Sequence, residues 1–64
     1  MTKKELERLF VENGGVVEVA DTLWISNYGF KYNLYSEKDE YTPIKELTVE
    51  EAIYAVENYG KVGK

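Results

Sequence analysis

The stretch from Thr22 to Tyr35, TLWISNYGFKYNLY, constrains the fold more than any other part of this chain. It contains two short runs rich in aromatic and β-branched residues, which are typical of strands. The residues between the runs, Asn27-Tyr28-Gly29, are typical of a tight turn. The sequence therefore predicts a β-hairpin with strands over 22–26 and 30–35, and the rest of the chain must cover one of its faces.

A helix is predicted before the hairpin, over residues 2–13. Thr2 and Glu5 have the spacing of a capping box, in which each side chain accepts a hydrogen bond from the other residue's backbone N–H. Gly14 can adopt the left-handed conformation that ends many helices. The apolar residues between these signals recur at helical spacing: Leu6, Leu9 and Phe10.

A first strand is predicted over residues 16–20, where the β-branched sequence VVEVA follows a glycine pair. Asp21-Thr22 then separates this strand from the next one. Two strands joined by a tight turn, or one long bulged strand over 16–26, both fit this pattern. We favour two strands.

The second half of the chain is predicted to contain an acidic extended link over 36–47 and a helix over 49–59. Thr48 and Glu51 repeat the capping-box spacing, and Gly60 is placed to end the helix. Residues 60–64 are predicted to form a short tail. The apolar stripe of this helix consists of Val49, Ala52, Ile53, Val56 and Tyr59.

This order of elements predicts a single small two-layer α+β domain over 1–64. A three-stranded antiparallel meander would carry both helices on one face, because short connections favour neighbouring antiparallel strands. Strand alternation assigns the faces. The predicted core face consists of Val17, Val19, Leu23, Ile25, Phe30, Tyr32 and Leu34. The opposite face consists of Glu18, Thr22, Trp24, Ser26, Lys31, Asn33 and Tyr35, and is mostly polar apart from two aromatic residues.

Composition excludes several classes of function. The chain has no cysteine and no histidine, so it lacks a thiol nucleophile, the usual general base near neutral pH, and thiolate and imidazole metal ligands. We therefore expect no catalytic activity, no metal and no cofactor. No apolar run approaches the roughly 20 residues that span a bilayer. We expect a cytoplasmic protein that does not bind membranes.

Negative charge is concentrated in one segment. The net charge is −4, and residues 36–51 contain six acidic and two basic side chains. Surfaces that bind phosphate groups need clustered lysine and arginine. Direct binding to nucleic acid is therefore not expected.

The sequence favours a small, acidic, non-enzymatic protein that binds another protein, one with a basic surface. Tryptophan and tyrosine are enriched at protein interfaces, and acidic side chains would steer a basic partner. The candidate partner-binding residues are Trp24, Tyr28, Tyr35, Glu37, Asp39, Glu40, Tyr41 and Glu46.

One form of this hypothesis is an inhibitor that occupies a nucleic-acid-binding surface of its target by presenting carboxylates in place of phosphates. In size, charge and order of elements the chain is similar in general build to small acidic proteins of phages and mobile elements, including some anti-CRISPR inhibitors. No motif carries this similarity. The alternatives are a homodimeric structural or regulatory module and, more distantly, a sensor that binds a small ligand near Trp24 and the tyrosines.

Overall fold

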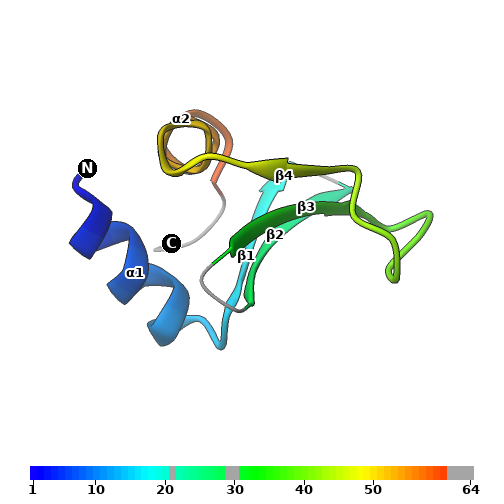
Figure 1. The fold of residues 1–64 in the computed structure, drawn as a ribbon, viewed down its shortest axis with the longest axis horizontal. Coiled ribbons are helices and arrows are strands. Elements are labelled where there is room, and N and C mark those ends of the chain that lie inside the picture. The colour runs from blue at the N-terminus through cyan, green and yellow to red at the C-terminus, as the bar shows by residue number, and fades with distance from the viewer. Residues whose placement is uncertain (21, 29–30, 61–64) are drawn as a thin grey trace.

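The computed structural model describes residues 1–20, 22–28 and 31–60, without the side chain of Tyr28. Within these residues, the elements are α1 (Lys3–Glu12), β1 (Val16–Ala20), β2 (Leu23–Tyr28), β3 (Lys31–Ser36), β4 (Lys45–Leu47) and α2 (Val49–Tyr59). The strands form one antiparallel sheet in the order β1-β2-β3-β4. Both helices lie on the same side of it (Figure 1). The predicted small α+β domain, with both helices on one face of a meander, is confirmed.

Both helices begin with the capping boxes that the sequence predicts. The Thr2 hydroxyl oxygen accepts from the Glu5 N–H at 3.2 Å, and the Glu5 carboxylate accepts from the Thr2 N–H at 2.7 Å. Thr48 and Glu51 make the same two bonds, at 3.1 and 2.9 Å. These bonds satisfy N–H groups that the start of a helix leaves without a partner. After α1, Gly14 has a φ of 72°, a conformation that glycine adopts without steric cost.

The core lies between the helices and the inner face of the sheet, which we define as the face that they cover. The ring of Phe10 from α1 meets the ring of Tyr32 from β3 edge-on, with 5.1 Å between their centroids. Leu23 and Leu34 pack against this core from the rim, so the predicted core face is correct for its described members. The buried residues are Leu6, Phe10, Val17, Val19, Ile25, Tyr32, Ala52 and Val56.

The hairpin differs from the prediction in its bounds. Asn27 and Tyr28, predicted to form part of the turn, belong to β2, where they lie opposite Tyr32 and Lys31. The Asn27 N–H also donates to the Gly15 carbonyl at 2.9 Å. These backbone bonds outweigh the turn preference of the sequence. Gly29 and Phe30, and residues 61–64 of the predicted tail, lie outside the described residues.

The predicted link over 36–47 is wrong at both ends. Ser36 belongs to β3, and residues 45–47 form β4, which pairs with residues 32–34 of β3. Backbone pairing with β3 creates this short strand, although two of its three residues are charged. Residues 16–26 do form two strands, with an irregularity in β1 between Glu18 and Ala20.

One predicted core residue is exposed. Tyr59 is the last residue of α2 and is 56% exposed. Its ring packs edge-on against that of Tyr54, with centroids 6.3 Å apart. Because Tyr54 is itself 61% exposed, this pair lies on the solvent side of α2 and adds little to the core.

Candidate partner-binding surface

The face of the sheet opposite the helices, which we call the outer face, carries a stacked aromatic pair. Trp24 of β2 lies directly opposite Tyr35 of β3. Their rings are nearly parallel, with an angle of 11° and 6.0 Å between the centroids. Both side chains are partly exposed, whereas their strand neighbours Ile25 and Leu34 face the core. Trp24 and Tyr35 therefore form the apolar centre of a surface that no described helix covers.

Glu18 extends this pair into a row across three strands. It lies opposite Trp24 in the β1–β2 register, just as Tyr35 lies opposite Trp24 in the β2–β3 register. Directly opposite residues have Cβ atoms about 4.5–5.5 Å apart. Glu18 is exposed, so in this row Trp24 has the ring of Tyr35 on one side and an exposed acidic residue on the other. Alternation placed Glu18 on this face, but only the register reveals it as a neighbour of Trp24.

The other end of the outer face is polar and contains an ion pair. The ammonium of Lys31 lies 4.0 Å from the carboxylate of Glu46 on β4. Glu46 lies opposite Asn33, so this predicted site residue shares the outer face with the aromatic pair. Tyr28, another predicted site residue, is opposite Lys31 in the register, and its side chain lies outside the described part of the structure.

The connection between β3 and β4, residues 37–44, carries the remaining predicted site residues. It extends away from both helices (Figure 1). The carboxylate of Asp39 accepts the backbone N–H groups of Tyr41 and Thr42, at 3.0 and 3.1 Å. These bonds, that of Tyr41 first, hold the pKa of Asp39 below its ordinary value. Asp39 therefore organises this loop, while Tyr41 is 92% exposed.

The base of the loop lies beside the aromatic pair. The Glu37 N–H donates to the Thr22 carbonyl at 2.9 Å, which carries the pairing of β2 and β3 one residue further. Glu37 thus follows Tyr35 along the strand, next to the start of β2. The structure brings Trp24, Tyr35 and Glu37 together, sets Glu46 at the other end of the same face, and leaves Asp39, Glu40 and Tyr41 on the projecting loop.

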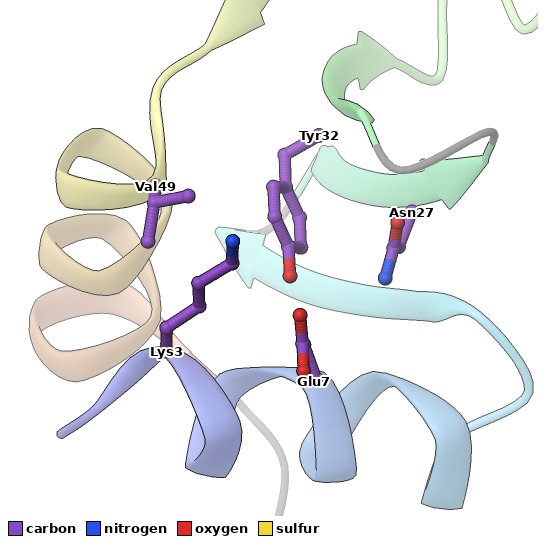
Figure 2. Close-up of a pocket in the computed structure, with 5 residues that line it drawn as sticks. All are labelled: Lys3, Glu7, Asn27, Tyr32 and Val49. Carbon is purple, nitrogen blue, oxygen red and sulfur yellow. The ribbon is translucent and has the colours of Figure 1, made fainter.

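A pocket lies on the opposite side of the sheet, between α1 and the inner face (Figure 2). Its volume is about 90 Å³, well below the roughly 300–1,000 Å³ typical of ligand sites. The hydroxyl of Tyr32 and the carboxylate of Glu7 point toward each other in it. Burial, with a smaller effect from the Glu7 charge, raises the pKa of Tyr32. No sequence pattern groups its lining residues, which are Lys3, Glu7, Asn27, Tyr32 and Val49.

Two further findings concern the described residues only. They contain no group of three or more acidic, cysteine or histidine side chains that could hold a metal ion. None of their helices has the length and apolar character that crossing a membrane requires.

Comparison with known proteins gives no relative. No protein-family model matches the chain, and it has no significant similarity to a curated protein or to a solved structure. The function is therefore inferred from the geometry of the surface alone.

Proposed function

We propose that this protein binds another protein through the outer face of its sheet, and that the bound surface of the partner is basic. The stacked pair of Trp24 and Tyr35 on an uncovered sheet face is the observation that carries this proposal. Tryptophan and tyrosine dominate binding energy at interfaces because their large rigid rings bury much area at little entropic cost.

The charge around the pair supports a basic partner. Glu18 flanks Trp24, and Glu37 follows Tyr35 at the base of the loop. The one lysine of the described outer face, Lys31, is paired with Glu46. The whole chain has a net charge of −4. A surface of this sign attracts a basic partner over long range and repels an acidic one.

The finer hypothesis, an inhibitor that occupies a nucleic-acid-binding surface, depends on the acidic loop. The loop presents Glu37, Glu40 and the exposed ring of Tyr41 beyond the end of the sheet. Asp39 contributes less to such mimicry, because its carboxylate already accepts two backbone N–H groups.

Self-association is the alternative, and the position of Glu18 argues against its simplest form. β1 is an edge of the sheet, so its outer backbone groups could pair with a second copy. A symmetric antiparallel pair centred on Glu18 would place two carboxylates directly opposite each other, which is destabilising. A basic side chain of another protein, placed opposite Glu18, would not be repelled in this way.

The experiment is capture of partners from lysate by the immobilised protein, compared with two variants. Trp24→Ser removes the centre of the outer face, and Tyr54→Ser removes an exposed tyrosine from α2 as a matched control. We expect a basic protein that the wild type and Tyr54→Ser retain, that Trp24→Ser loses, and that elutes as salt is raised. Equal capture by all three proteins would contradict the proposal.

Sedimentation equilibrium of the protein by itself, at micromolar concentrations in low and moderate salt, tests the alternative. A monomer is expected, since the acidic outer faces repel one another. A dimer that persists in both salts, and that Trp24→Ser dissociates, would mean that the outer face binds a second copy.

A further inference from the structure

We propose that the outer face holds an arginine side chain of the partner, with the guanidinium stacked on the indole of Trp24 and hydrogen-bonded to the carboxylate of Glu18. This inference rests on the proposed function, because it names the group that the partner presents. It follows from the register of three strands, which places a neutral ring on one side of Trp24 and an acidic residue on the other.

Trp24 has different neighbours on its two sides in the register. Tyr35 stacks on Trp24 from β3, and Glu18 lies opposite Trp24 on β1. A flat cation that enters between Trp24 and Glu18 would contact a ring face and a carboxylate together. Cations bind most strongly to the face of tryptophan among the aromatic side chains.

The shape of this site favours arginine over lysine. A guanidinium is planar, so it can lie against the indole and still direct two N–H groups at a carboxylate. It is also more weakly hydrated than an ammonium, so its transfer to a partly buried ring costs less. A lysine could satisfy the charge of Glu18 but not the planar contact.

The chain's own cations do not occupy this position among the described residues. The nearest lysine on the outer face, Lys31, lies at the far end of the β2–β3 ladder from Trp24 and contacts Glu46. The described ion pairs are those of the Met1 amino group with Glu57, Lys31 with Glu46, and Lys45 with Glu51. None of them involves Glu18, which is exposed and lies opposite Trp24 in the register.

The test is an NMR titration of the full chain with three blocked tripeptides, acetyl-Gly-X-Gly-amide, in which X is arginine, lysine or citrulline. Citrulline keeps the shape of arginine and lacks its charge. Trp24 is the only tryptophan, so its indole N–H signal reports on the site. We expect a saturable shift with the arginine peptide, binding of the lysine peptide weaker by about threefold or more, and no saturation with citrulline.

Two charge-neutralising variants complete the test. Glu18→Gln should weaken binding of the arginine peptide by about threefold, whereas Glu12→Gln, which removes the same charge from the end of α1, should leave it unchanged. Equal binding of the arginine and lysine peptides, binding of citrulline equal to that of arginine, or no effect of Glu18→Gln would overturn the inference. Neither variant alters a buried residue, so both are expected to fold.

The two proposals fail separately. If a partner depends on Trp24 but the arginine peptide does not bind, the outer face is an interface and the guanidinium site is wrong. If the arginine peptide binds as predicted but capture of every partner is independent of Trp24, the site exists and the proposed function is wrong.

Discussion

The two faces of the sheet hold their aromatic residues in different environments. On the inner face, the ring of Tyr32 is buried against Phe10 and both helices cover the surface around it. On the outer face, Trp24 and Tyr35 stack on each other and stay partly exposed. A buried ring is explained by folding, because removing apolar area from water is what stabilises a small domain. An uncovered pair flanked by Glu18 and Glu37 adds less to the core, and it is the feature on which the proposed binding function rests.

Neighbouring residues of β2 provide the sharpest test of this difference, since Ile25 and Trp24 point to opposite faces. Ile25→Ala removes fully buried methyl groups and should lower the free energy of unfolding by about 2–5 kcal/mol. A domain of this size has only about 3–5 kcal/mol in total, so the variant should lose a large part of its stability and its urea midpoint should fall steeply. Far-UV circular dichroism and urea titration would measure this. A variant that stays folded with unchanged stability would mean that the inner face is not the core.

Trp24→Ser should have a smaller effect on folding. The variant loses one partly exposed aromatic contact, which is worth about 0.5–1.5 kcal/mol beyond the area buried. We expect a folded protein whose urea midpoint is moderately reduced. If Trp24→Ser lowers the free energy of unfolding as much as Ile25→Ala does, Trp24 is a core residue and the contrast between the faces is lost.

The next largest expected effect on the free energy of unfolding comes from removing a helix cap. Thr48→Ala removes the hydroxyl that accepts the Glu51 N–H at 3.1 Å, and should lower the free energy of unfolding by about 1 kcal/mol. Thr2→Ala does the same at α1, and the two effects should add because the boxes are separate. Urea titration of both single variants and the double variant would show this. If only one of the two substitutions lowers the free energy of unfolding, the helix that carries the other does not depend on its cap.

The smallest expected effect is a dependence on pH that arises from the same helix starts. Hydrogen bonds from Lys45 and from the Thr48 N–H hold the pKa of Glu51 below its ordinary value, and bonds from the backbone and then the side chain of Thr2 do so for Glu5. A carboxyl whose pKa is lower in the folded state stabilises the fold above its unfolded pKa of about 4.3. That contribution is lost as the pH falls through the lowered folded value.

The urea midpoint should therefore be nearly constant at weakly acidic pH and fall below about pH 4.3. Glu51→Gln should reduce this fall, since glutamine can still accept the Thr48 N–H but does not titrate. A midpoint that rises on acidification would contradict the lowered pKa values of Glu5 and Glu51.

Local signals in the sequence predicted the helices and the faces well, because their causes are local. The capping boxes at Thr2 and Thr48 mark both helix starts, and alternation alone separates Ile25 from Trp24. β4 was missed because its charged residues carry no alternation, and only pairing with β3 makes them a strand. The turn at Asn27 was misplaced for the same reason, since its backbone bonds come from residues far away in the chain.

The candidate surface was predicted in part. Trp24 and Tyr35 were placed on it by residue type and alternation, but their neighbours depend on register. Glu46 was chosen for its charge, and only the pairing of β4 with β3 places it on this face. Glu18 becomes a neighbour of Trp24 only through the pairing of β1 with β2, which a single sequence does not specify. Asp39 was grouped with the acidic residues for its charge, and the structure shows that it mainly holds the loop.

The most direct test of the difference between the two faces is the position of the partner on the domain. Amide and indole NMR signals of the labelled protein would be recorded with and without the protein captured through the wild-type chain. We predict that the affected signals map to Glu18, Trp24, Tyr35 and the start of the loop at Glu37, while those of α2 around Tyr54 stay unchanged. A footprint centred on α2, with the signals of Trp24 and Tyr35 unmoved, would contradict the account.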